Sequence, residues 1–415
     1  MAYFEHNMNM RKIGAAKLFD GYRMLEKHVL MIWDDGTVEA VVPIQEAGEG
    51  VAQLDGVLTP GFVNCHCHLE LSHMKGKIPE RTSLVDFVFK VVTERKASDE
   101  EIAAAIANAE HEMNGGGIVA VGDICNNTST LAQKQKNILR YYNFIESSGW
   151  LPTVSGARFE TAKRLSDAFR EQSANDHQQI NCSIVPHAPY SVSHDLWLKL
   201  QPQFRDKVVS IHNQETAFED EFFLKGTGDF ERMYALMKID NAHYQPTAKS
   251  SLQSYFHKLS GAKKIILVHN TFTRQEDLDF VKKANGEWSV MNSEGKSSQP
   301  QTPNSKLQTF FCLCVNANQY IENALPPINL LRENNCTLVL GTDSLASNWS
   351  LSIADEMKSI RKHFPAITLD EMLRWATING ATALGFEKQL GSFEKGKRPG
   401  CVLLSEKDLE VRRLL

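Results

Sequence analysis

The 415-residue sequence has few of the features that would assign it to a specialised class of protein. Its 8 cysteines are far below the density of a disulfide-stapled domain, and none belongs to a C-x-x-C pair. No stretch approaches the roughly 18 apolar residues of a membrane span, and no basic segment followed by an apolar one stands at the N-terminus. The net charge of −5 gives no basic excess that would indicate nucleic acid or an anionic membrane as a partner. We therefore expect a cytoplasmic protein that binds neither nucleic acid nor a membrane.

What the sequence does contain is the composition of an ordinary globular protein. Apolar residues make up 42% and charged residues 23%, which excludes a disordered chain, a collagen and a coiled coil. The chain is long enough for a large core, either in two or three domains of about 150 residues or around one barrel of about 250. The pairs Cys65/Cys67 and Cys312/Cys314 are each two residues apart, and we interpret them as reduced thiols packed in β-strands.

The pattern of apolar residues divides the chain into three parts. Residues 1–58 contain short strand-like runs around the turn signal Asp34-Asp35-Gly36. Residues 59–385 alternate short buried runs with helical periodicity, and residues 386–415 return to turns and short strands. The buried runs are 61–64, 118–121, 141–145, 182–186, 208–211, 264–268, 309–314 and 337–341. We predict an α/β protein with a (β/α)8 TIM barrel over 59–385, beside a small composite β-sandwich domain formed by the N- and C-terminal segments.

Two segments interrupt this alternation. Residues 213–260 are too long for one helix and its loops, and they carry five aromatic residues: Phe218, Phe222, Phe223, Phe230 and Tyr234. These rings could form a substrate lid that stacks on a flat ligand, or they could pack a helix onto the barrel, and both interpretations stay open. Residues 292–308 are polar and rich in turn formers, which predicts an exposed loop.

Histidines and an aspartate follow several of the predicted strands. His66 and His68 come after the first strand and, two residues apart, can point to the same side. His212, His269 and Asp343 end the fifth, sixth and eighth strands, at about 36 to 39 residues per strand–helix unit except for the longer step between the two histidines. All of them therefore fall at the carboxyl ends of strands, where barrel enzymes keep their active sites. Three imidazoles and a carboxylate at that rim predict a divalent-metal site.

Two more residues lie near this predicted site. Glu215 follows His212 by three residues, so its carboxylate could act as a general acid/base without binding the metal. A solvated loop glutamate, or a charge at the start of a helix, is the alternative. His187 ends the fourth strand and could hold a substrate, although a structural role beside the two neighbouring prolines is equally open.

Several motifs together resemble the amidohydrolase superfamily, in its cytosine deaminase-like and chlorohydrolase-like branch. Residues 58–68 read Leu-Thr-Pro-Gly-Phe-Val-Asn-Cys-His-Cys-His and match the superfamily's first-strand motif. Residues 341–344 read Gly-Thr-Asp-Ser and, with Ala-Ser-Asn at 346–348, match its strand-eight motif, while 376–381 and 384–385 match its closing helix. The resemblance extends from about residue 57 to residue 396. The sequence departs from it at residues 314–318, where a proline is missing, and at 399–400, where Pro-Gly replaces Ala-Asp.

The resemblance implies a role for each candidate residue. The metal ligands would be His66, His68, His212 and Asp343, in a (β/α)8 barrel beside a composite β-sandwich. Binuclear members carry a carboxylated lysine at the end of strand four, where this chain has His187, so the resemblance implies one divalent ion, with zinc favoured and iron possible by the ligand set. His269 would then be catalytic rather than a ligand.

The resemblance also implies a hydrolytic deaminase. Asp343 would take a proton from the metal-activated water, His269 would hold the hydroxide, and Glu215 would protonate a ring nitrogen of an amino-substituted heterocycle. This implies a small-molecule heterocyclic substrate as the partner. Because members of the superfamily often form dimers or larger assemblies, a homodimer is also possible.

The substrate is indicated by one short string. Residues 68–72 read His-Leu-Glu-Leu-Ser, similar to aminodeoxyfutalosine deaminases, which adds Glu70 to His187 as a candidate substrate-binding residue. The string could equally serve only to turn the chain from strand to loop. Guanine deamination and triazine dechlorination or deamination remain alternatives, and a non-catalytic scaffold of the same fold is a remote one.

Overall fold

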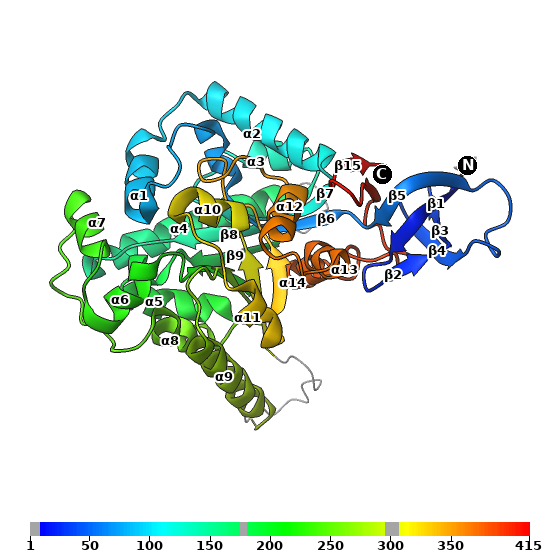
Figure 1. Ribbon diagram of the computed structural model, residues 1–415. Helices are drawn as coiled ribbons and strands as arrows, with labels where there is room; N and C mark the ends of the chain where they lie inside the picture. Colours follow the sequence, from blue (N-terminus) through cyan, green and yellow to red (C-terminus); the bar gives the residue numbers. More distant parts are fainter. Residues whose placement is uncertain (1–8, 175–180, 295–306) are drawn as a thin grey trace.

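The structure is a computed structural model that describes residues 9–174, 181–294 and 307–415. Figure 1 shows a large α/β lobe beside a small β lobe, and the first and last strands of the described chain belong to the sheet of the small lobe. The loop predicted at 292–308 falls mostly outside the described residues, and its first three residues end helix α9 (Gln275–Glu294). Among the described residues, no helix combines the length and the apolar character that a bilayer crossing requires.

The large lobe is built on two parallel four-stranded sheets. The strands of the first sheet, in spatial order, are β6 (Phe62–Cys67), β7 (Ile118–Cys125), β8 (Arg140–Ser147) and β9 (Asn181–Pro186). Those of the second are β10 (Val208–Asn213), β11 (Lys264–His269), β12 (Gln308–Leu313) and β13 (Thr337–Leu340). Each of the eight predicted runs is a strand, and almost every residue in them is buried, as expected for parallel sheets covered by helices.

Helices fill the connections between the strands, as the periodicity predicts. They are α1 (Ser83–Glu94), α2 (Asp99–Gly115), α3 (Leu131–Lys134), α4 (Ser155–Ala174), α5 (His194–Leu200), α6 (Ala217–Lys225), α7 (Phe230–Leu236), α8 (Ser251–Tyr255), α9, α10 (Val315–Glu322), α11 (Ile328–Glu333), α12 (Ile353–His363), α13 (Leu369–Arg374) and α14 (Gly380–Leu384). The Ser98 hydroxyl caps α2 by accepting a hydrogen bond from the Glu101 amide at 3.2 Å.

The small lobe contains one seven-stranded sheet that joins both ends of the chain. Its strands are β1 (Met10–Phe19), β2 (Met24–Glu26), β3 (His28–Trp33), β4 (Val38–Pro43), β5 (Ala52–Thr59), β14 (Val402–Leu404) and β15 (Val411–Arg413). The predicted turn at residues 34–36 connects the antiparallel strands β3 and β4. Strand β14 pairs antiparallel with β5, so residues from the two ends of the chain share hydrogen bonds.

The molecule has a second hydrophobic core that is separate from the main one. Its residues come from segments that follow the carboxyl ends of strands: Met74, Ile78, Leu84, Val85, Phe87, Trp150, Ala188, Tyr190, Phe222, Phe223, Phe230, Met233, Tyr234, Ile321 and Ala346. The rings of Trp150 and Tyr234 stack with centroids 5.2 Å apart, and Phe222 stacks on Tyr244 at 4.4 Å. The aromatics of 213–260 therefore pack against one another in α6, α7 and the loop that follows, and this layer covers the strand ends. A role of this layer as a substrate lid stays a prediction.

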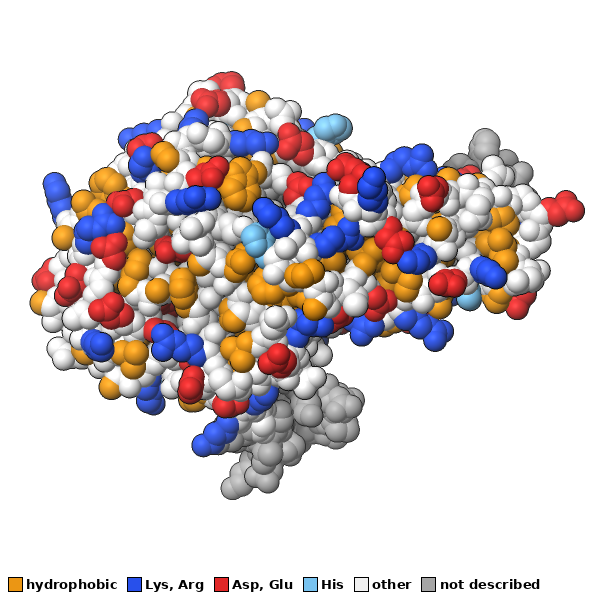
Figure 2. All heavy atoms as spheres, in the orientation of Figure 1, with side chains coloured by type: hydrophobic (Ala, Val, Ile, Leu, Met, Phe, Trp, Pro, Cys, Tyr) orange, Lys and Arg blue, Asp and Glu red, His pale blue; other side chains and the backbone are white. Residues whose placement is uncertain are grey.

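Acidic and basic side chains are interspersed over the surface. On the face drawn in Figure 2, neither sign of charge gathers into one large patch, and hydrophobic side chains lie between them in small groups. This distribution accords with the small net charge of −5. The described surface therefore gives no electrostatic reason to expect steering of a strongly charged partner toward this face.

The fully buried position of Phe222 predicts a stability effect. Phe222→Ala should lower the free energy of unfolding by about 3–5 kcal/mol, because it removes a buried ring and leaves a cavity. Leu224→Ala on the same helix is the control, since Leu224 is 39% exposed and its loss should change stability far less. Chemical denaturation of both variants measures the difference. Equal stabilities of the two variants would contradict the assignment of Phe222 to this core.

Candidate metal centre

The predicted metal ligands converge at one point of the large lobe. His66, His212, His269 and Asp343 each offer a ligand atom, and these atoms all lie within 4.8 Å of one another. The Nε2 atom of His68 lies 3.2 Å from that of His66, 3.3 Å from that of His212, and 3.2 Å from Oδ1 of Asp343. Imidazole nitrogens that face one another at such distances fit around a shared cation. The structure therefore brings together all four predicted ligands, with His269 beside them.

Burial and neighbouring charges set the protonation of these groups. Burial lowers the pKa of His68 to about 3 and that of His212 well below its ordinary value, so both imidazoles are neutral at physiological pH. Burial alone would raise the pKa of Asp343, but the hydrogen bond from His66 and the adjacent imidazoles outweigh it, and the pKa lies well below its usual range. Neutral imidazoles and an ionised carboxylate are the forms that bind a divalent metal.

The backbone and a serine fix Asp343 in place. Its φ of 58° is in the left-handed region, a cost that surrounding contacts must outweigh for a residue other than glycine. The amide of Asp343 donates to the His66 carbonyl at 3.0 Å, and the Ser347 hydroxyl donates to Oδ2 of Asp343 at 2.6 Å. Gly341 permits this close approach, because a Cβ there would lie 2.9 Å from the Cβ of His66.

Glu215 and His269 form a pair beside the cluster. Oε1 of Glu215 lies 3.6 Å from Nε2 of His269. Burial raises the pKa of Glu215 well above its ordinary value, and the charges of Asp343 and Glu322 add to this effect. Nδ1 of His269 donates to Oδ1 of Asn318 at 2.9 Å, which leaves the lone pair on Nε2 facing the cluster. Burial thus favours the protonated form of the Glu215 carboxyl group, and by lowering the pKa of His269 it favours the neutral imidazole.

Glu70 and His187 lie on the side of the cluster formed by β6 to β9. Oε2 of Glu70 accepts a hydrogen bond from the Asn126 amide at 3.0 Å. The side chain of Asn126 donates to Oε2 of Glu146, also at 3.0 Å, so one asparagine links two buried carboxyl groups. Burial raises the pKa of both Glu70 and Glu146 to about 7. The rings of His187 and His212 have centroids 4.7 Å apart.

Glu146 is a residue that the sequence analysis did not identify. Its Oε1 is buried, lies 3.7 Å from Nδ1 of His212 and has no hydrogen-bond partner among the described residues. Its position at the carboxyl end of β8 was the one available signal. Asn318 and Ser347 were also missed as functional residues, although both stand in the motifs at 314–318 and 346–348, and those motifs could have identified them.

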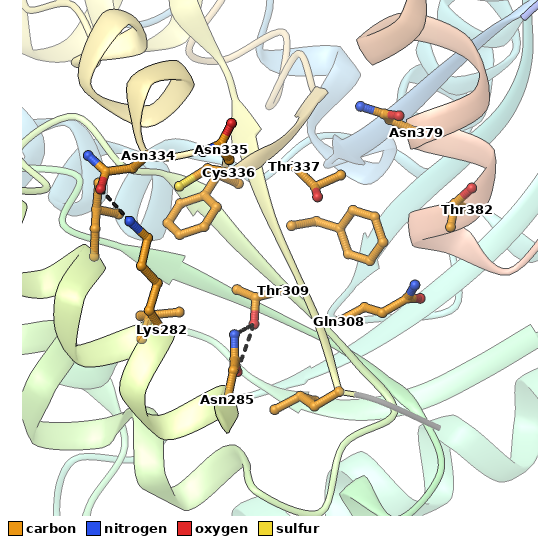
Figure 3. Close-up of a pocket in the computed structure, with 15 residues that line it drawn as sticks. Lys282, Asn285, Gln308, Thr309, Asn334, Asn335, Cys336, Thr337, Asn379 and Thr382 are labelled. Atoms are coloured by element: carbon orange, nitrogen blue, oxygen red, sulfur yellow. Dashed lines mark hydrogen bonds between the residues drawn. The ribbon is translucent and has the colours of Figure 1, made fainter. Parts of the chain in front are cut away.

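A cavity of about 350 Å³ lies away from this cluster (Figure 3). It opens near the amino ends of β12 and β13, and polar residues such as Gln308, Thr337 and Asn379 line it. None of its lining residues belongs to the metal cluster. The candidate site is therefore the cluster at the carboxyl ends of the strands and not this cavity.

The site combines histidines and a carboxylate at the carboxyl ends of parallel strands with a carboxylic acid beside them. Such a set of residues in an α/β fold is typical of a metal-dependent hydrolase. Comparison with known families supports this class. Residues 57–413 match the sequence model of the Amidohydrolase family, and the chain belongs to this family.

Known proteins resemble the chain over most of its length. An adenosine deaminase of Helicobacter pylori is 26% identical over 349 residues, which cover 83% of this chain and 78% of that protein. The crystal structure of Helicobacter pylori aminofutalosine deaminase, solved with methylthio-coformycin, has a TM-score of 0.75 at 21% identity and covers 96% of this chain and 93% of that one. An adenosine deaminase from Xanthomonas campestris with bound zinc has a TM-score of 0.68 at 20% identity, covering 96% of this chain and 85% of that one. These structures share the fold.

The cluster predicts the metal content of the purified protein. We expect one divalent ion per chain by elemental analysis, and Asp343→Ala should lose it because the variant removes the one ionised ligand of the set. Glu110→Gln is the matched control, since Glu110 is a buried carboxyl group that instead accepts a hydrogen bond from Tyr141 at 2.7 Å. Two ions per chain, or an Asp343→Ala protein that keeps its ion, would show that the ligand set is wrong.

Proposed function

We propose that the protein is a metal-dependent aminohydrolase that deaminates an adenosine-type nucleoside. The observation that carries this proposal is the Glu215–His269 pair at 3.6 Å, next to the cluster of imidazoles and the Asp343 carboxylate. A carboxylic acid that stays protonated and an imidazole that stays neutral suit the addition of water to a ring carbon with protonation of the adjacent nitrogen. The relatives named as deaminases support the same reaction.

His66, His68, His212 and Asp343 would hold one divalent cation. Their nitrogen and oxygen donors suit zinc, which the Xanthomonas structure contains, although the same set also accepts iron. When bound, such an ion supplies Lewis acidity that lowers the pKa of water toward 7.

The protein side chains would carry the protons of the reaction. The Asp343 carboxylate accepts a proton from the attacking water, and Nε2 of His269 accepts a hydrogen bond from it. Glu215 delivers its proton to the ring nitrogen next to the amino-bearing carbon, so that this carbon becomes electrophilic. Water adds, the amino group takes up a proton, and ammonia leaves while a carbonyl forms on the ring.

The opposite side of the site would hold the sugar. Glu70, Glu146 and His187 lie on the β6–β9 side, while Glu215 and His269 lie on the β10–β11 side. With the reacting edge of a purine turned toward Glu215, its sugar faces the two carboxyl groups. The partnerless Oε1 of Glu146 is suited to accept a hydrogen bond from a sugar hydroxyl.

We further propose that the two parallel sheets close into one (β/α)8 barrel over 59–385. An isolated parallel bridge between Cys67 and Asp343 links β6 to the segment after β13, and the His212 amide donates to the His187 carbonyl at 3.0 Å across the other junction. Residues 1–58 and 386–415 would form the composite β-sandwich domain, and their shared sheet supports this division.

The role of Glu215 predicts the effect of a conservative change. Glu215→Gln should keep the metal but lower kcat about 10²- to 10⁴-fold, because the amide retains the shape and cannot deliver a proton. Ammonia release from adenosine measures the rate, and Glu231→Gln, on the exposed surface of α7, is the control. A rate close to that of the wild type would remove Glu215 from the mechanism.

The sugar-binding side predicts a pattern of substrate selectivity. Glu146→Ala should lower kcat/KM for adenosine about 10- to 100-fold, because a lost hydrogen bond to a charged group weakens binding by about that factor. The same variant should change kcat/KM for 2′,3′-dideoxyadenosine much less.

The wild type should release ammonia from adenosine or 5′-methylthioadenosine faster than from guanine or an aminotriazine. The opposite order would favour one of the alternative activities, and a metal-free, inactive protein would favour the scaffold.

A further inference from the structure

The proposed proton donor sits in a short, strained turn. Residues 213–216 connect the last part of β10 to helix α6, and Glu215 lies in their middle. Gln214 has a φ of 45°, in the left-handed region that disfavours residues with a Cβ. Such a conformation persists only where surrounding contacts determine it. What holds this turn therefore decides where the Glu215 carboxyl group points.

Glu219 supplies two contacts to the backbone of this turn, in addition to the hydrogen bond that the Phe272 amide donates to the Gln214 carbonyl at 3.0 Å. Its side chain is fully buried in the first turn of α6. Oε1 accepts a hydrogen bond from the Gln214 amide at 3.0 Å, and Oε2 accepts one from the Glu215 amide at 3.2 Å. The Ser251 hydroxyl donates to Oε1 as well, which fixes the carboxyl group itself. One carboxyl group thus holds both consecutive peptide groups that precede the Glu215 side chain.

These hydrogen bonds are not those of an ordinary helix cap. A glutamate at the third position of a helix commonly bonds the amide of the N-cap residue, which here is Thr216. Glu219 instead bonds the two amides before Thr216, outside the helix. The carboxylate therefore fixes the turn that carries Glu215.

The side chain of Gln214 has partners of its own, one of which is Asp220 of α6, at 3.2 and 3.3 Å from Nε2 of Gln214. Its Nε2 donates to Oδ2 of Asp277 at 2.8 Å, and its Oε1 accepts from the Thr273 hydroxyl at 2.7 Å. Asp277 and Thr273 come from the segment after β11, so the turn is held on its side-chain face without Glu219. Loss of Glu219 would remove the hydrogen bonds to the Gln214 and Glu215 amides, while the Gln214 side chain and the Gln214 carbonyl keep their partners. We therefore expect a local effect on Glu215.

We propose that Glu219 is a positioning residue for the proton donor: it orients Glu215 toward His269 by binding the Gln214 and Glu215 amides. The inference rests on the proposed function, because the hydrogen bonds of Glu219 affect catalysis only if Glu215 is the proton donor. It adds a residue that touches neither the substrate nor the metal and acts only through Glu215.

The test is a double-mutant cycle between the two glutamates. Glu219→Gln preserves the side-chain shape but removes an acceptor, and it should lower kcat about 10- to 100-fold with KM and metal content unchanged. In the Glu215→Gln background the same change should have no further effect, because the group that it positions is already disabled. A purely structural role would give the same loss in both backgrounds.

Glu221→Gln is the matched control on the same helix. Glu221 is exposed and accepts a hydrogen bond from the Thr227 hydroxyl at 2.9 Å, and among the described residues it makes no hydrogen bond with the turn. It should leave kcat unchanged in both backgrounds. A loss of activity in Glu219→Gln that is independent of Glu215, or one that follows a loss of metal, would overturn the proposal.

A structural readout keeps the inference separate from the proposed function. If the wild type releases no ammonia from any amino-substituted ring, the proposed function fails, and crystal structures of the wild type and Glu219→Gln then decide the positioning role. A Glu215 carboxyl group displaced from His269 in the variant supports it. An unchanged separation of 3.6 Å between Oε1 and Nε2 overturns it.

Discussion

The convergence of imidazole nitrogens on the Asp343 carboxylate is the constraint on which the rest of the structure depends. Imidazole nitrogens that face one another at 3.2 to 3.3 Å in a buried space are stable only where a proton or a cation lies between their lone pairs. The fold imposes this arrangement through strands that end at one place and through a left-handed backbone at Asp343. The His66 carbonyl accepts a hydrogen bond from the Asp343 amide and holds that backbone, while Ser347 donates to the Asp343 carboxylate. The main hydrophobic core and the second core over the strand ends contribute stability that offsets such local strain.

Burial gives chemically identical groups different roles in this small volume. Asp343 is kept ionised because imidazoles surround it, whereas Glu215 is kept protonated because apolar burial and neighbouring negative charge dominate its surroundings. Glu70 and Glu146, with pKa values near 7, lie between these extremes. Carboxyl groups whose pKa values differ within one site are the usual way in which a fold supplies both an acid and a base near neutral pH.

The fold and the metal cluster were largely predictable, and their surroundings were not. Eight continuous apolar runs predicted the eight strands because a parallel strand buried on both faces leaves a strong local signal. His66, His212 and Asp343 could be placed because strand ends share one rim. Glu146 stands at a strand end too, but it and Glu219 are 2 of 50 acidic residues, and their roles arise from contacts with remote segments. The aromatics of 213–260 were left between two interpretations, because the sequence does not show that they pack against Trp150 and Tyr190.

The pairing of β14 with β5 bears on how the chain acquires its structure. These strands lie on either side of the whole α/β region, so their hydrogen bonds close a very long loop. Such non-local pairing is slow to form, and during synthesis β5 must wait for its partner until almost everything between them has emerged. Until then, one edge of the small sheet presents unpaired backbone groups that could join a neighbouring chain. Folding of this protein in the cell is therefore expected to depend on protection of that edge during translation.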